Sequence, residues 1–294
     1  MKEKKIIALG FFDGVHLGHQ ALLKACVDLA QQQNIVPAAI TFHRHPRSLF
    51  ATGVPLMLNS LEDRHRLLRQ YGMRQVITVP VSPEIMQMPW QEFLSTLLTE
   101  GAVGFVCGAD FRFGHRGEGN AALLESYCKE HSLPCVIGPE QLLEGVRISS
   151  THIRGLIETG EMETAVAFLG HPHILSGAVV RGQQLGRKIG IPTANLLIPP
   201  GVLVPKCGVY ACRITTDQGE FSAVTNVGTR PTVAGNGVTV EPWILDFDGD
   251  LYGKVVTLSF YKFLRPEKKF PTLQDLQAEI QKNAMEVRNF FEKY

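Results

Sequence analysis

Hydrophobic and polar positions follow one rhythm in the first part of the chain and another in the rest. In the first part, short apolar runs alternate with segments whose apolar residues recur every three or four positions, which is typical of strands alternating with helices. The predicted strands are 6–9, 35–42, 75–81, 102–107 and 134–137, and the predicted helices are 21–30, 60–71, 89–100, 120–131, one from within 148–154 to 159, and 161–169. This alternation predicts a parallel sheet with helices on both faces, whose ligands bind beyond the carboxyl ends of the strands.

From residue 174 onward the pattern is that of a β-domain. Runs rich in Val, Ile, Thr and Tyr are separated by turn residues, and the predicted strands are 174–180, 191–198, 208–215, 221–227, 238–247 and 254–263. Such a series predicts an antiparallel barrel or sandwich. One amphipathic helix, 272–292, ends the chain, and Thr272 with Asp275 resembles a capping box. At 294 residues the chain can build two cores, so we expect domains at 1–172 and 173–294.

The composition excludes several classes of function. A net charge of +1 argues against a general nucleic-acid or membrane-surface role. No apolar run approaches the roughly 18 to 20 residues of a membrane span, and the first apolar run is too short for a signal peptide. Six cysteines are scattered without a CxxC pair, which indicates reduced thiols in a cytoplasmic protein.

A glycine-rich segment, GFFDGVHLGHQ at 10–20, lies between the first predicted strand and the first helix. The unpaired amides and the positive dipole end of a helix start make a ready anion site. His16 and His19 are three residues apart, so they share a face there and can donate to a polyphosphate. On its own the pair could equally be a helix start without a ligand. A second group of hydroxyls with an arginine, ISSTHIR at 148–154, favours the phosphate site.

The second part has its own glycine-rich segment, GQQLGRKIGIPTANL at 182–196. Three glycines spaced by four can bring their amides close to phosphate. Thr193 and Asn195 alternate along a strand, so both face the same side, and their oxygens suit Mg²⁺ and a phosphate. Glu241, in TVEPWILDF, is a candidate general base. The alternatives are strand-end hydrogen bonding for Thr193 and Asn195, and a solvent-facing strand edge for Glu241.

Taken in order, these motifs resemble those of the bifunctional bacterial riboflavin kinase/FAD synthetases. The first part resembles their FMN adenylyltransferase module, a member of the nucleotidyltransferase superfamily, through GFFDGVHLGHQ, GADFRFGHRGEG and ISSTHIR. The second part resembles their riboflavin kinase module through GQQLGRKIGIPTANL, TNVGTRPT, TVEPWILDF and LYG. The resemblance implies a Rossmann-like domain that adenylylates FMN, and an antiparallel β-barrel with a terminal helix that phosphorylates riboflavin. ATP is the co-substrate of both steps, and Mg²⁺ is the implied cofactor.

The resemblance also implies roles for single residues. In the adenylyltransferase, His16 and His19 are catalytic and hold ATP, together with Gly10, Phe11, Asp13, Gly14, Gly18, Ser149, Ser150, Thr151 and Arg154. Asp110, Arg112 and Arg116 shape the flavin or nucleotide site, unless they only stabilise their loop. In the kinase, ATP is held by Gly182, Gly186, Gly190, Thr193 and Asn195, and the last two also hold Mg²⁺. Glu241 takes the proton from the ribityl 5′-hydroxyl, and Arg288 contacts flavin.

The chain departs from the family pattern at several positions. After the second predicted strand, His45-Pro46 fits the family pattern, but His43 and Arg44 do not. After the third predicted strand, PVSPEIMQM at 80–88 replaces a stretch that usually contains phenylalanine. Asn283 stands where the family often has aspartate.

The residues after Glu241 depart as well, since Pro242 and Trp243 replace a small or β-branched residue and a histidine. Proline removes a strand amide, so we expect this strand to lie at an edge or to bulge there. The alternatives to a bifunctional enzyme are therefore an adenylyltransferase with an impaired kinase domain, and a non-catalytic flavin-binding regulatory protein.

Overall fold

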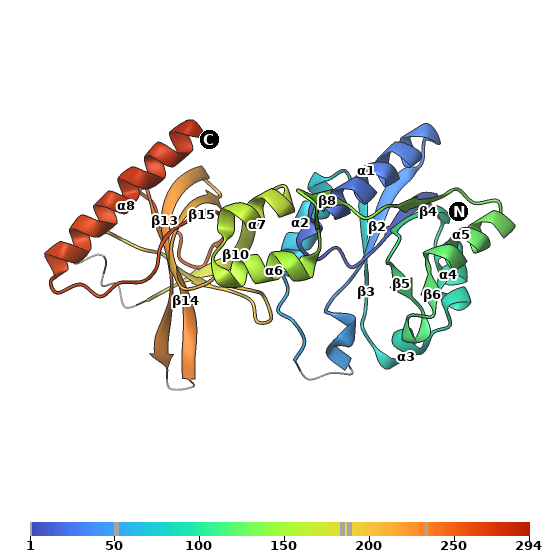
Figure 1. The fold of residues 1–294 in the computed structure, drawn as a ribbon, viewed down its shortest axis with the longest axis horizontal. Coiled ribbons are helices and arrows are strands. Elements are labelled where there is room, and N and C mark those ends of the chain that lie inside the picture. The colour runs from blue at the N-terminus through green and yellow to red at the C-terminus, as the bar shows by residue number, and fades with distance from the viewer. Residues whose placement is uncertain (1, 50–52, 183–185, 187–189, 233–234) are drawn as a thin grey trace. The chain divides into compact units, whose positions relative to one another are not determined.

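The computed structural model describes residues 2–49, 53–182, 186, 190–232 and 235–294 (Figure 1). The chain divides into two compact units. One comprises Met1–Met57 and Leu61–Ser150, and the other comprises Leu58–Ser60 and Thr151–Tyr294.

The first unit is built on a parallel sheet of five strands in the order β3-β2-β1-β4-β7. The strands are β1 (Lys5–Leu9), β2 (Val36–Phe42), β3 (Gln75–Val79), β4 (Ala102–Gly108) and β7 (Cys135–Gly138). The chain runs outward from β1 to β3 and then returns to the other side of β1 through β4. This reversal makes the carboxyl ends of β1 and β4 the place where a ligand crevice is expected.

Helices cover both faces of this sheet, which confirms the expected α/β fold. Ile7 and Leu9 of β1 join a core with Phe93 of α4 (Trp90–Thr99) and Leu124 of α5 (Ala121–Glu130). Alternate residues of a strand face opposite sides, so the other residues of β1 face the second side of the sheet. There α1 (Leu17–Gln32) packs on β1 and β2, and its Cys26 thiol donates to the Ile6 carbonyl. α2 (Leu61–Gln70) contacts β3.

Short elements fill the connections beyond the strand ends, and the apolar pattern did not predict most of them. They are η1 (Asp13–Val15), η2 (Pro46–Leu49), α3 (Pro83–Gln87), the ribbon β5 (Arg112–Phe113) with β6 (Gly119–Asn120), η3 (His115–Gly117), and the ribbon β8 (Leu142–Leu143) with β9 (Val146–Arg147). Asn120 caps α5, since its side chain accepts a hydrogen bond from the Leu123 amide at 3.0 Å.

The second unit is a closed antiparallel barrel in the order β10-β11-β14-β13-β12-β15, which confirms the predicted barrel. Its strands are β10 (His173–Val180), β11 (Asn195–Leu197), β12 (Gly208–Thr216), β13 (Gly219–Thr232), β14 (Gly235–Ile244) and β15 (Val255–Arg265). Two helices, α6 (Ser150–Thr159) and α7 (Met162–Leu169), precede the barrel, and α7 contacts β10 and β15. β11 is shorter than the predicted strand 191–198.

The terminal helix α8 (Leu273–Lys293) packs on the outside of the barrel. Its Ala284 and Val287 form a core with Val209, Val224 and Leu245 of the barrel wall. The predicted cap is confirmed, because the Thr272 hydroxyl accepts from the Asp275 amide at 3.1 Å. A full apolar stripe together with this cap explains why the sequence located α8 closely.

The expectation that β14 lies at an edge or bulges at Pro242 is wrong. The barrel is closed, so β14 lies between β11 and β13, and its register with β13 runs unbroken through the pairs Asn226–Glu241 and Thr225–Pro242. The Pro242 carbonyl points toward β11, since it accepts from the Ala194 amide at 2.9 Å. In an antiparallel ladder the amide and carbonyl of one residue point to the same neighbouring strand, so the amide that proline lacks would also face β11. The proline therefore removes no hydrogen bond between β14 and β13.

Two candidate active sites

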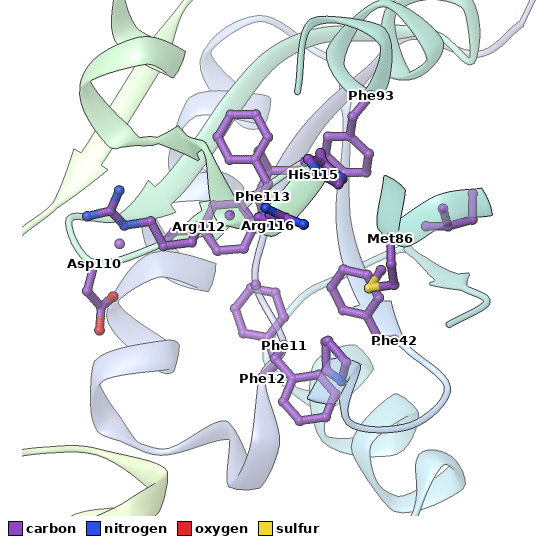
Figure 2. A pocket seen from close by; sticks show the side chains of 18 of the residues that line it. Phe11, Phe12, Phe42, Met86, Phe93, Asp110, Arg112, Phe113, His115 and Arg116 are labelled. Carbon is purple, nitrogen blue, oxygen red and sulfur yellow. The ribbon is translucent and has the colours of Figure 1, made fainter. Parts of the chain in front are cut away.

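A cavity of about 1080 Å³ opens in the first unit beyond the carboxyl ends of β1 and β4 (Figure 2). Its apolar wall is rich in aromatic rings: Phe11, Phe12, Phe42, Phe93, Phe111 and Phe113. Phe111 and Phe113 are stacked, with ring centroids 5.6 Å apart and an angle of 14° between the planes. The cavity lies where the strand order reverses, and its volume and aromatic wall suit a planar heterocycle.

The two histidines pack against each other at the start of α1. His16 is the N-cap, and its Nδ1 accepts from the His19 amide at 3.3 Å. The two rings are stacked, with centroids 3.7 Å apart, and the Phe12 ring meets His19 edge-on. His19 lines the cavity, whereas His16 is 6% exposed and supports it from behind. The structure thus gives the two predicted residues different environments.

The turn before α1 is conformationally constrained. Phe12 and Val15 have positive φ angles of 57° and 39°, which non-glycine residues rarely adopt. A Cβ at Gly10 would lie 2.8 Å from the Phe12 ring, so only glycine fits that position. Gly14, at φ 81°, supplies a further left-handed residue. Such strain is typical of a backbone shaped for a ligand.

Burial and neighbouring positive groups keep His19 neutral. Desolvation, followed by the influence of His16 and Arg64, lowers the pKa of His19 well below its ordinary value. Its Nδ1 is buried and has no hydrogen-bond partner among the described residues. A neutral imidazole carries one N–H donor, so His19 can donate to a phosphate oxygen without bearing a charge beforehand.

The predicted polar residues after β4 also reach this cavity. Asp110, Arg112 and Arg116 line it, and Figure 2 shows Asp110 and Arg112 on the side opposite Met86 and Phe42. Asp110 forms an ion pair with Arg147 of β9 at 2.5 Å, a partner that the sequence had not singled out. Asp110 thus both lines the cavity and pairs with Arg147, and its role in substrate binding stays a prediction.

The ISSTHIR segment begins against the histidine turn. The Ser150 hydroxyl donates to the Asp13 carbonyl at 2.9 Å, and Asp13 itself is 2% exposed. Thr151 and Arg154 follow on α6, within the second compact unit. The ATP-binding roles of Ser149, Ser150, Thr151 and Arg154 stay predictions.

A second candidate site lies on the barrel wall, where two predicted polar residues, Asn195 of β11 and Glu241 of β14, occupy neighbouring strands. Asn226 of β13 pairs with Glu241 of β14. On the other side of β14, the pairs Leu196–Val240 and Thr193–Trp243 share one register, which places Asn195 opposite Glu241. Directly opposed residues point to the same face of a sheet. Glu241 is thus flanked by an asparagine on each side.

The glycine segment approaches this site closely. A Cβ on Gly182 would lie 2.4 Å from Asn195 Nδ2, and one on Gly186 would lie 3.6 Å from Thr193 Oγ1. Gly190 has a φ of 71°, which favours glycine. Residues 183–185 and 187–189 of the segment lie outside the described residues. The contacts at Gly182 and Gly186 place backbone beside both predicted Mg²⁺ residues.

Each of the two units matches a family model. Residues 1–152 match the FAD synthetase family, and residues 169–291 match the riboflavin kinase family. A bifunctional riboflavin kinase/FMN adenylyltransferase from Listeria monocytogenes is 34% identical, over 98% of this chain and 93% of the relative. One from Escherichia coli K12 is 36% identical, over 99% of this chain and 94% of the relative. The chain belongs to this bifunctional family.

These matches confirm the resemblance noted in the motifs.

A crystal structure described as a macrolide-efflux protein from Streptococcus pneumoniae has a TM-score of 0.88 with this chain, at 29% identity. That likeness covers 98% of this chain and 95% of the other. Across the described residues, no helix is both long and apolar enough to cross a membrane.

Two departures from the family pattern contact each other. His43 Nδ1 accepts from the Val81 amide at 2.9 Å, and Arg44 donates to the Val81 carbonyl at 3.1 Å. Val81 leads into α3, whose Ile85 and Met86 form part of the cavity wall. The unusual residues after β2 thus hold the unusual segment after β3.

On α8, Asn283 and Arg288 each have a partner on the barrel. Asn283 is 3% exposed, and its Oδ1 accepts from Arg265 Nε and Nη2 at 3.1 and 2.9 Å. Arg288 forms an ion pair with Asp246, which follows β14. A flavin contact for Arg288 stays a prediction.

Sequence reasoning missed Arg64, which lies behind the histidine turn. Arg64 is 1% exposed. Its position on α2 could have indicated this burial, since Arg64, Leu67 and Leu68 share one buried face of the helix. A charged residue on the apolar face of a helix is rare, and this pattern could have identified Arg64 as a candidate functional residue.

Proposed function

We propose that this chain catalyses both steps from riboflavin to FAD. Residues 173–294 transfer the γ-phosphoryl group of ATP to riboflavin, and residues 1–172 transfer the adenylyl group of a second ATP to the resulting FMN. The observation that carries the proposal is the presence of both family matches in one chain, each with its own candidate site. The six cysteines are free thiols, which supports a reducing, cytoplasmic location.

In adenylyl transfer the FMN phosphate attacks the α-phosphorus of ATP in line, and pyrophosphate leaves. No covalent enzyme intermediate is needed, so the protein positions the reactants and stabilises charge on the phosphates. His19 donates to the phosphates from the cavity wall, and His16 holds His19 and the first turn of α1 in place. Gly10 and Gly18 make room for the Phe12 and His16 rings of the turn, and Gly14 supplies its left-handed backbone.

The remaining groups complete this nucleotide and flavin site. The aromatic wall stacks on a ring system, and Asp110, Arg112 and Arg116 bind the polar end of a substrate. The resemblance in the motifs further assigns polyphosphate binding to the hydroxyls of ISSTHIR and to Arg154, and ATP binding to Phe11 and Asp13.

In the kinase reaction Glu241 accepts the proton of the ribityl 5′-hydroxyl as the hydroxyl oxygen attacks the γ-phosphorus, and ADP leaves. Gly182, Gly186 and Gly190 bring backbone amides to the phosphates. Thr193 and Asn195 supply the hydroxyl and amide oxygens that Mg²⁺ prefers, and Gly182 and Gly186 lie against them. Mg²⁺, when bound, supplies charge neutralisation of the phosphates.

Incubating the protein with riboflavin, ATP and Mg²⁺ should yield FMN and then FAD, because both candidate sites are built. The measurement is chromatographic separation of the flavins over time, with a parallel reaction supplied with FMN. A chelator in place of Mg²⁺ should stop FMN formation. FAD from FMN without FMN from riboflavin would instead identify an impaired kinase domain, and neither product would favour a flavin-binding regulatory protein.

Gly182→Ala should reduce riboflavin phosphorylation by roughly 10- to 100-fold, since small misplacements of reacting groups have effects of that order. The added Cβ would lie 2.4 Å from Asn195 Nδ2 and displace that side chain. Steady-state FMN formation is the measurement. Gly155→Ala on α6 is the matched control, because its Cβ would meet no described atom within 4 Å beyond its chain neighbours and the backbone of its own helix. Equal phosphorylation rates in the two variants would contradict the placement of Gly182.

A further inference from the structure

Arg64 is a buried charge that the proposed mechanism does not use. Its Nη1 donates to the Thr41 hydroxyl at 2.9 Å, to the Phe42 carbonyl at 3.0 Å and to the Phe11 carbonyl at 3.3 Å. Its guanidinium lies 4.6 Å from the centre of the Phe11 ring. Arg64 is 1% exposed, and its Nε has no hydrogen-bond partner among the described residues.

These contacts converge on the backbone that begins the histidine turn. The Thr41 hydroxyl also donates to the Phe11 carbonyl, at 2.7 Å, so this one oxygen is held by two side chains. The next residue, Phe12, has the strained φ of 57° and places its ring against His19. Phe11 and Phe42 both line the cavity (Figure 2). Arg64 thus connects the ends of β1 and β2 behind the cavity wall.

A purely structural role explains a charge at this position poorly. Desolvation lowers the pKa of Arg64, and the attraction of Asp13 only partly opposes that effect. A well-packed apolar side chain often serves as well as a buried ion at such a position. The positive charge also acts on His19, whose pKa Arg64 helps to lower.

We propose that Arg64 is a positioning residue for adenylyl transfer, which fixes the Phe11 backbone and places a permanent positive charge behind His19. The inference rests on the adenylyl-transfer function proposed above. A fixed charge at this place attracts a polyphosphate, and it does so without a proton from solvent. After burial and His16, it also contributes to keeping His19 a neutral donor.

The charged and titratable groups around His19 come from several elements. His16 and Asp13 belong to its own turn, and Arg64 comes from α2. Asp110, Arg112, His115 and Arg116 line the same cavity from the segment after β4. Arg64 differs from the cavity arginines because it is buried and held by three oxygen acceptors.

The test compares Arg64→Met, Arg64→Lys and Leu68→Ala. Leu68 is fully buried on the same helix, so its variant reports a packing defect without loss of charge. Arg64→Met should lower kcat/KM for FMN adenylylation by roughly 10- to 100-fold and raise KM for ATP, as expected for loss of a charge-assisted contact. NMR titration of the imidazoles should show a higher pKa for His19 in Arg64→Met and no change in Leu68→Ala.

Arg64→Lys separates the charge from the geometry. It should preserve the lowered pKa of His19 yet still reduce kcat, because lysine lacks the planar fork that holds several acceptors. This variant also carries the test if Arg64→Met fails to fold. Riboflavin phosphorylation in every variant reports the integrity of the other unit.

Two results would overturn the inference: an unchanged His19 titration in Arg64→Met, or adenylylation by Arg64→Lys at the wild-type rate. Absence of FAD formation by the wild-type protein would instead refute the proposed function itself.

Discussion

His19→Ala is expected to slow adenylylation of FMN by roughly 10²- to 10³-fold, the effect of removing one preorganised donor from a developing charge. His19 lines the cavity at the start of α1, and its neutral ring donates to the phosphates. Phosphorylation of riboflavin should stay unchanged, because Glu241, Asn195 and Thr193 belong to the other unit. The measurement is FAD formation from supplied FMN and ATP, beside FMN formation from riboflavin.

Two companion variants make this result specific. His131→Ala removes an exposed histidine at the end of α5 and should leave both rates unchanged. His16→Ala removes the acceptor for the His19 amide. This variant should therefore lower the free energy of unfolding by about 0.5–2 kcal/mol, as loss of an N-cap does. A wild-type rate of FAD formation in His19→Ala would refute a phosphate contact by that residue.

Glu241→Gln is expected to lower FMN formation by roughly 10²- to 10⁴-fold, the usual contribution of a general base. Glutamine has the same shape, so it should keep the place of Glu241 between Asn195 and Asn226, but it cannot accept the proton. FAD formation from supplied FMN should be unaffected. The rates of the two partial reactions, measured separately, check this expectation.

Glu220→Gln is the matched control, since Glu220 is a half-exposed carboxylate that pairs with Arg213 on the same barrel. It should leave FMN formation at the wild-type rate. Undiminished FMN formation in Glu241→Gln would place the base elsewhere, whereas a loss in both variants would point to a general effect of charge on the barrel.

The regular elements were predictable from the chain because burial imposes a period on them. β1 is buried along its whole length, and α8 carries a continuous apolar stripe with a cap, so both have strong local signals. The ribbons β5–β6 and β8–β9 contain strands of two residues, which are too short to show any period. β14 is not an edge strand because it pairs with β11, a segment about 40 residues earlier in the chain, so a local rule about proline misjudged it.

The candidate sites divide in the same way. His19, Asp110, Arg112 and Arg116 belong to dense motifs, and the structure brings all four to one cavity. The aromatic wall was not predicted, because its rings come from distant segments whose phenylalanines also suit an ordinary core. Arg64 and Arg147 were missed because their importance lies in partners that only folding brings together.

The position of Glu241 between two asparagines limits which insertions and deletions a lineage of this gene can survive. Side chains along a strand alternate between faces, so a shift of one residue in β14 would put Val240 in the place of Glu241 and turn the carboxylate toward the barrel interior. Natural selection should therefore eliminate the loss or gain of a single codon within this strand. Changes of length at the turns that join the strands leave the register intact, and variation in gene length should accumulate there.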